Sequence, residues 1–391
     1  MRKIPVIICA LASLTAYGQD SKEIFNPVQY AITSLAIAPD ARGGGMGDIG
    51  AATEADGMSQ YWNPAKYPFN IARAGVNVSY TPWLRQLVND IDLAYVSGFY
   101  RIGDYNALSA SLTYFSLGEV FYGNSSGQID ESYSLRPKEF SIDVAYSRML
   151  TQNFSAAVAL RFIYSDLSWD REAESKAAKS FAADIALYRI GYFMAGSREC
   201  AFSWGINLSN IGSKVNYGGS DYSQFLPTNL RLGIGFQIPF DEYNRLSIYA
   251  DANKFLIPTM PIQREDETDQ DYQERLRKDY YDVSPINGIF KSFSDAPGGF
   301  KEELKEINWA IGLEYNYNDR FLVRGGYHDE SAVKGNRKYF SVGAGFRMSI
   351  FAIDASYVIA TTPSNPLDQT MRFTLGFDLD GIKDLFSTKR R

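Results

Sequence analysis

The residue with the greatest potential for chemistry is His328, the single histidine of the chain, which is followed by Asp329 and Glu330. A histidine oriented by a carboxylate can activate a serine, and Ser331 stands next to this run. Sequence alone cannot position a serine partner, because a catalytic triad is recognised by its geometry. A lone histidine at the outer end of a strand is more common than a catalytic one. Because the chain has a single histidine, a metal site built from histidines is implausible. We therefore expect no enzyme activity, no cofactor and no metal.

Two glycine motifs match catalytic or cofactor patterns without their structural context. Residues 45–50 (GMGDIG) fit the dinucleotide fingerprint, but no strand precedes them and no βαβ unit follows. Residues 123–127 (GNSSG) fit the nucleophile-elbow pattern, but they fall in a predicted surface loop instead of a strand-to-helix turn. Neither motif predicts chemistry here.

The elements that must position any such residue are strands, because apolar side chains recur at every second position from residue 71 onward. One example is the face Phe154, Ala156, Val158, Leu160, Phe162 and Tyr164. The alternation persists over roughly 9–12 residues at a time, longer than the strands of most soluble sheets. We predict about fourteen strands, near 71–81, 90–101, 104–118, 138–149, 152–168, 179–194, 199–211, 226–238, 243–258, 306–317, 319–330, 337–346, 350–361 and 368–379.

The connections between these strands alternate in length. Every second one is short, at 102–103, 150–151, 195–198, 239–242, 318 and 347–349, whereas the others are mostly longer, above all 259–305. Short turns on one rim and long loops on the other are typical of outer-membrane β-barrels. We therefore predict an all-β fold, a transmembrane antiparallel β-barrel over residues 71–380, with 259–305 outside the cell and both termini in the periplasm. The alternatives are a soluble barrel or sandwich.

The termini complete the expected domain organisation. Residues 1–18 read as a cleaved signal peptide, since Arg2 and Lys3 precede a short apolar run that ends at Ala16-Tyr17-Gly18. Export to the cell outer membrane follows from that signal and the barrel. Residues 19–70 do not alternate, and we expect them to form a plug in the lumen, the alternative being a periplasmic tail. Residues 381–391 form a periplasmic tail. The net charge of −6 argues against nucleic-acid binding.

The long loop 259–305 is the most distinctive feature outside the barrel. Its acidic run 265–271 is followed by basic residues, which suits the dipole of a helix. Tyr272, Leu276 and Tyr280 are spaced to share one face of that helix. Such an apolar face needs a cover, either from the barrel's own loops or from a protein partner. We take these three residues as candidate partner-binding residues.

The segment before the first strand resembles the hatch of the FadL-like outer-membrane proteins. The resemblance rests on Gly43, Gly45 and Gly47 in residues 41–47 (ARGGGMG), on Ala51-Ala52, and on Asn63, Pro64 and Ala65 in residues 61–65 (YWNPA). It implies a barrel of about fourteen strands with an N-terminal plug, which agrees with the strand count. In length, signal peptide and long acidic loop, the whole chain also resembles the PorV family of the type IX secretion system.

That second resemblance implies a shuttle. Such a protein binds the C-terminal signal domain of cargo at the translocon barrel and delivers it to a cell-surface attachment complex with a sortase-like protease, in contact with outer-membrane lipids including lipopolysaccharide. Two other functions stay open, a FadL-like channel for hydrophobic molecules and a lipid A deacylation factor. Inward-facing charged residues, Asp143, Arg161, Asp184, Arg231 and Glu314, favour a wet or plugged lumen over an acyl pocket.

Overall fold

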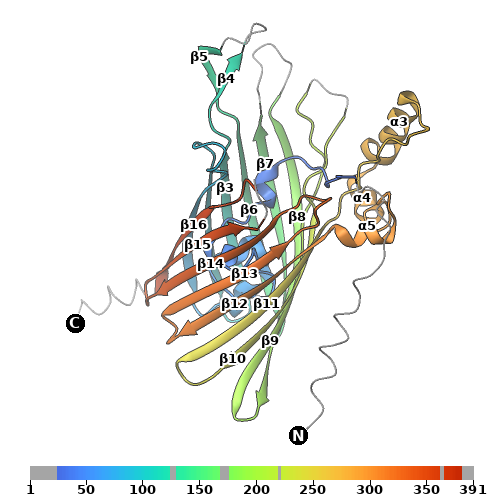
Figure 1. Ribbon diagram of the computed structural model, residues 1–391. Helices are drawn as coiled ribbons and strands as arrows, with labels where there is room; N and C mark the ends of the chain where they lie inside the picture. Colours follow the sequence, from blue (N-terminus) through green and yellow to red (C-terminus); the bar gives the residue numbers. More distant parts are fainter. Residues whose placement is uncertain (1–23, 124–128, 168–175, 219–221, 362–364, 381–391) are drawn as a thin grey trace.

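The computed structural model describes residues 24–123, 129–167, 176–218, 222–361 and 365–380. Within these ranges, fourteen antiparallel strands form a closed barrel in which β1 pairs with β16 (Figure 1). The strands are β1 Ala74–Pro82, β2 Asp92–Ile102, β3 Asn106–Ser116, β6 Lys138–Thr151, β7 Phe154–Asp166, β8 Ala178–Ala195, β9 Arg198–Gly212, β10 Asn229–Pro239, β11 Asn244–Phe255, β12 Ile307–Tyr317, β13 Phe321–Asp329, β14 Lys338–Arg347, β15 Phe351–Ala360 and β16 Met371–Asp378. The predicted fold class is confirmed.

Each barrel strand overlaps one of the strands predicted from the sequence. The prediction missed a separate hairpin, β4 Val120–Gly123 and β5 Ile129–Leu135, inside the loop predicted at 119–137. This hairpin pairs only with itself and stands beyond the outer rim (Figure 1). Because it forms a two-stranded sheet of its own, the long period-two pattern of the lipid-facing wall does not extend to it.

The alternation of side chains follows from the two environments of the wall. Outward residues such as Val158 and Leu160 are exposed for lipid, whereas their neighbours Ala157, Ala159 and Arg161 are buried in the interior. A strand of a transmembrane barrel meets lipid with only every second residue. Because that requirement holds along the whole strand, the period-two pattern is long enough to be found in the sequence.

Helices occur in two groups, one inside the barrel and one beside its outer end (Figure 1). The inner group comprises the 3-10 helices η1 Thr33–Ala36 and η2 Pro64–Phe69 with the short helices α1 Ala41–Gly44 and α2 Ser59–Trp62. The outer group comprises α3 Asp269–Leu276, the π-turn η3 Arg277–Tyr281, α4 Pro285–Lys291 and α5 Phe300–Lys305. In the described part of the chain, no helix has the length and apolar character needed to cross a membrane. The predicted signal peptide and C-terminal tail lie outside the described residues.

The structure places the two rims at opposite ends, which gives a prediction for topology. Asp241 lies in the turn between β10 and β11, and Asp269 begins α3 in the long loop at the other end of β11. A peptide tag inserted at Asp269 is expected to bind antibody on intact cells, whereas one at Asp241 is expected to bind only after the outer membrane is opened. The reverse labelling would show that the barrel is inserted the other way.

Candidate functional site: the barrel interior and its outer mouth

The N-terminal segment, residues 24–70, enters the barrel and is fixed there by its own polar side chains. Asp40 caps α1, because its carboxylate accepts hydrogen bonds from the Gly43 amide at 2.9 Å and from the Trp62 indole at 2.5 Å. Trp62 is 2% exposed. A single buried carboxylate therefore joins the beginning of α1 to the end of α2 and holds both parts of the segment together.

The glycines that carry the hatch resemblance lie where the segment meets other groups most closely. A Cβ atom on Gly43 would stand 2.4 Å from the Trp62 ring, and one on Gly45 would stand 3.1 Å from the Gly343 Cα of the wall. Gly47 has a φ of +86° and packs against the backbone of Tyr327. Close approach and left-handed backbone are the two situations that require glycine.

Asn63, Pro64 and Ala65 form the turn between α2 and η2. The Asn63 side chain accepts a hydrogen bond from the Ala65 amide at 3.0 Å. Its amide group donates to the carbonyls of Ala51 at 3.0 Å and of Leu187, on β8, at 2.9 Å. Pro64 occupies the first position of η2, where its missing N–H costs nothing. This motif thus connects the segment to itself and to the barrel wall.

Several charged residues in the interior are paired with one another. Arg42 of α1 lies 2.8 Å from Glu314 of β12, which also contacts Arg324 of β13 at 2.6 Å. Arg324 reaches Asp354 of β15 at 2.5 Å. On the far wall, Arg161 contacts Asp143 at 3.1 Å and Asp184 at 2.9 Å.

These pairs explain why charged residues are tolerated in the interior, since a buried charge needs a partner. Because Arg42 belongs to the N-terminal segment and Glu314 to the wall, one of the networks ties the two together. Asp251 of β11 adds to this, since its carboxylate accepts the amides of Gly50 and Ala51 at 2.9 and 3.0 Å.

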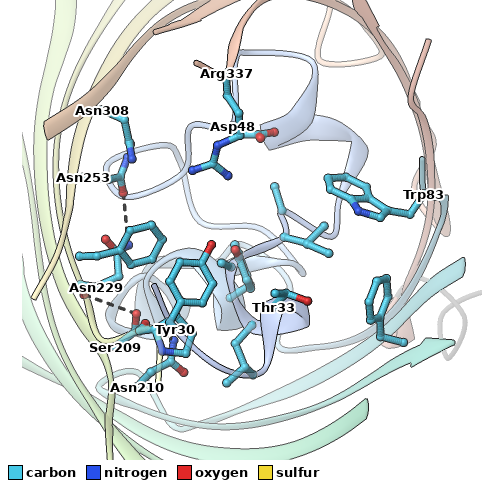
Figure 2. A pocket seen from close by; sticks show the side chains of 18 of the residues that line it. Tyr30, Thr33, Asp48, Trp83, Ser209, Asn210, Asn229, Asn253, Asn308 and Arg337 are labelled. Carbon is cyan, nitrogen blue, oxygen red and sulfur yellow. Dashed lines mark hydrogen bonds between the residues drawn. The ribbon is translucent and has the colours of Figure 1, made fainter. Parts of the chain in front are cut away.

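A cavity of about 330 Å³ lies between the N-terminal segment and the outer loops (Figure 2). One wall is apolar and includes Leu35, Ile37, Trp83, Ile91 and Phe115. The opposite wall carries amides and guanidinium groups, namely Asn229, Arg231, Asn253, Asn308 and Arg337. Figure 2 shows Trp83 on one side of the cavity and the asparagines on the other. The cavity is therefore amphipathic, and no sequence motif marked it because its lining comes from distant strands and loops.

His328 lines this cavity. It is buried, not exposed at the rim as its position suggested, because its ring stacks on Tyr339 with centroids 4.9 Å apart. Its Nδ1 donates to the Gly47 carbonyl at 3.1 Å, and Nε2 has no hydrogen-bond partner among the described residues. The serine contact that the enzyme hypothesis required is thus not made within the part of the chain that the structure describes.

The three candidate residues of the long loop lie in a cluster formed by the barrel's own loops. Leu276 and Tyr280 are buried against Phe225 and Ile257, and Tyr272 packs at the edge of this cluster. The Tyr280 hydroxyl donates to the Gln29 carbonyl at 3.0 Å, which links the outer loop to the N-terminal segment. The sequence left two possibilities for what covers this apolar face, the barrel's own loops or a protein partner. In the structure, the barrel's own loops cover it.

Charges in the same loop hold α3 in place. Arg275 of α3 contacts Glu267, just before the helix, at 2.6 Å. The hydrogen bonds from Arg275 lower the pKa of Glu267 to about 2. Thr268 caps α3 by accepting from the Asp271 amide at 3.2 Å. The acidic-then-basic pattern thus serves the loop's own structure.

The closed fourteen-strand wall, the helices inside it and the outward apolar face together define a transmembrane β-barrel with its N-terminal segment in the lumen. Among solved structures, the CymD monoaromatic hydrocarbon channel matches with a TM-score of 0.50 and 11% identity over 90% of this chain and 99% of that one. The toluene transporter TbuX of Ralstonia pickettii gives a TM-score of 0.44 at 12% identity, covering 87% and 96%. A FadL homologue of Pseudomonas aeruginosa gives 0.42 at 12% identity, covering 90% and 99%. At such identities, a likeness concerns the fold alone.

The family of this chain follows from a comparison of its sequence with family models. The family of the type IX secretion system protein PorV matches residues 19–262, well over half of the chain. The chain therefore belongs to the PorV family and is an outer-membrane protein of the type IX secretion system. No curated protein matches the sequence.

Proposed function

We propose that this barrel is a shuttle of the type IX secretion system. It binds the C-terminal signal domain of cargo as the cargo leaves the translocon barrel, and it delivers the cargo to the cell-surface attachment complex with its sortase-like protease. Export of the shuttle itself would use the signal peptide, cleaved after Gly18. Family membership supports the secretion role, and the cavity at the outer mouth is the observation that supports binding of cargo.

The position of the cavity suits a protein that binds from outside. The N-terminal segment forms its inner side through Tyr30, Thr33, Asp48 and Trp62, and the wall contacts of Arg42 hold that segment in the lumen. Cargo can therefore engage the mouth without passing through the barrel. In this proposal the segment acts as a hatch.

The chemistry of the cavity suits an exposed stretch of polypeptide. The aromatic and aliphatic wall can cover apolar side chains, and buried aromatic contacts dominate the energy of many interfaces. The asparagines and arginines opposite can donate to backbone carbonyls. Tyr272, Leu276 and Tyr280, which we selected as partner-binding residues, would then contribute by holding the outer loop in shape, because Leu276 and Tyr280 are buried.

A tryptophan pair tests this proposal. Trp83 lines the cavity, whereas Trp309 lies on β12, 41% exposed on the outside of the wall. Trp83→Ala is expected to lower mature cargo at the cell surface and to build up cargo with its signal domain still attached. Truncation of an interface tryptophan of this kind costs about 2 kcal/mol or more of binding, roughly thirtyfold in affinity. Cargo is measured by immunoblotting of surface, periplasmic and medium fractions.

Trp309→Ala is the matched control, and it is expected to leave secretion unchanged when equal amounts of assembled barrel are present. Normal secretion in the Trp83→Ala strain would mean that cargo does not bind in the cavity. The contact with cargo would then have to be sought in the loops at 119–137 or 212–225. Intact secretion in a strain that lacks the whole protein would remove the shuttle role altogether. If lipid A acylation changed in that strain, a role as a lipid A deacylation factor would take its place.

The apolar wall of the cavity favours a second candidate, a channel for hydrophobic molecules. Leu35, Ile37 and Phe115 could accept a small apolar ligand. In this case the purified barrel would bind a fluorescent fatty acid or an aromatic hydrocarbon, and Trp83→Ala would weaken that binding while secretion stayed normal.

A further inference from the structure

A group of large apolar side chains is exposed on α4, α5 and the turn between them. We call this group the outer patch: Ile286, Phe290, Phe293, Phe300 and Leu304. Phe290 and Phe300 are 72% and 75% exposed, more than the lipid-facing Trp309 at 41%. Tyr280 in the same loop is only 2% exposed. The loop thus buries one apolar cluster and leaves five other large apolar side chains uncovered, and exposed apolar surface is typical of binding sites.

Ion pairs fix the direction in which α5 presents this patch. Glu303 and Glu306 contact Lys254, at the outer end of β11, at 3.0 and 2.6 Å. Glu302 and Glu306 contact Lys334, in the loop after β13, at 2.6 and 3.0 Å.

Both lysines are buried, so the acidic face of α5 is turned into the protein. Phe300, Lys301 and Leu304 lie on the opposite face by helical spacing, and all three are exposed. The face that points away from the protein is therefore apolar with a cationic residue.

The outer patch continues the lipid-facing surface of the wall. Helix α5 ends at Lys305, and β12 begins at Ile307. Trp309 and Ile311 follow on the outward face of β12, and tryptophan at the end of a barrel strand is typical of the interfacial aromatic girdle. In Figure 1, α4 and α5 lie to one side of the barrel, next to the outer ends of β11 and β12 and not over the mouth. The patch thus lies next to the outward-facing surface at the outer end of β12.

We propose that the outer patch inserts into the outer leaflet of the membrane as an interfacial anchor. Its phenylalanines enter the boundary between headgroups and acyl chains, and Lys301 reaches the anionic headgroups. Short amphipathic segments with aromatic and basic residues bind membranes in this way. The anchor would hold the long loop beside the barrel and leave the mouth clear. This inference rests on the barrel's place in the membrane and is independent of the shuttle role.

Depth-dependent fluorescence quenching tests the anchor. The full chain, with Cys9 and Cys200 replaced by alanine, receives Phe300→Cys or Phe290→Cys and a small polarity-sensitive dye. The barrel is folded into vesicles of phosphatidylcholine mixed with phosphatidylglycerol. These vesicles also contain lipids brominated on the acyl chain. The dye at either position is expected to lose most of its fluorescence and to be shielded from aqueous iodide.

Gln270→Cys is the matched control, because Gln270 is exposed on α3 of the same loop, outside the outer patch. Its dye is expected to be quenched by iodide and not by brominated lipid. Equal responses at positions 270, 290 and 300 would overturn the proposal. It would also fail if position 300 escaped lipid quenching and became shielded from iodide only in complexes extracted with other secretion proteins, since the patch would then be a protein interface.

The cationic contribution is tested separately with Lys301→Glu in the Phe300→Cys chain. Reversing this charge is expected to reduce quenching by brominated lipid in vesicles that contain phosphatidylglycerol and to leave it unchanged in pure phosphatidylcholine. A loss of quenching in both vesicle types would indicate that the change unfolds α5, which far-UV circular dichroism and the quenching at Phe290→Cys would detect. Unchanged quenching in both would remove Lys301 from the proposal.

Discussion

Gly326→Val is expected to drive the N-terminal segment out of the barrel, whereas Gly325→Val, one residue earlier on β13, is expected to leave it in place. A Cβ atom on Gly326 would lie 2.0 Å from the Met46 carbonyl carbon and 2.3 Å from its oxygen. At Gly325, the nearest atom is the Ser341 oxygen at 4.0 Å. The Met46 atoms in this contact belong to the backbone, and the added Cβ atom is fixed to the backbone of β13. No side-chain rotation can therefore relieve the clash.

The two variants form a matched pair, because they add the same side chain to adjacent positions of one strand. Overpacking of a tight interior costs roughly 1–3 kcal/mol, and a backbone clash belongs at the upper end. Permeability of intact cells to a large antibiotic and single-channel conductance in planar bilayers measure the result. Both are expected to rise for Gly326→Val alone, with the barrel still assembled as judged by heat-modifiable migration. Equal permeability for the two variants would mean that the segment does not close the lumen.

The barrel could be predicted from the sequence because lipid acts on every strand in the same way. Leu232, Ile234 and Phe236 on β10 face outward at every second position, and each is exposed for lipid. The short turns follow from the same requirement, since adjacent antiparallel strands need only a few residues to connect. The hairpin β4–β5 lies beyond the membrane and escapes this rule, and for this reason it was missed.

The candidate site was predictable only in part, because its contacts join distant positions. The hatch motif was visible, since tight turns and close approach restrict residue types at Gly47, Asn63 and Pro64. Their partners were not visible: Tyr327, Leu187 and Glu314 lie on separate strands, far along the chain. For Tyr280, helical spacing predicted an apolar face but could not show whether a loop or a partner covers it.

Loss of Glu314 is expected to lower the stability of the barrel. Its two oxygens contact Arg42 of the N-terminal segment at 2.8 Å and Arg324 of the wall at 2.6 Å. Glu314→Gln leaves two buried guanidinium groups without their shared anion. Removing one member of a buried ion pair costs about 3–5 kcal/mol. The loss is expected at the lower end of this range, because Arg42 still contacts Asp56 at 2.8 Å and Arg324 still contacts Asp354 at 2.5 Å.

Urea titration of the barrel folded in lipid measures the change in the free energy of unfolding. Glu242→Gln, in the exposed turn between β10 and β11, is the control and is expected to change it by less than about 0.5 kcal/mol. Adding Arg42→Met to Glu314→Gln is expected to restore part of the loss, because a buried guanidinium that has lost one of its carboxylate partners is then removed. This recovery separates a true network from an accidental contact: additive losses in the double variant would show that Arg42 and Glu314 act independently. The N-terminal segment would then be held by its other contacts, among them those of Asp251 and Asn63.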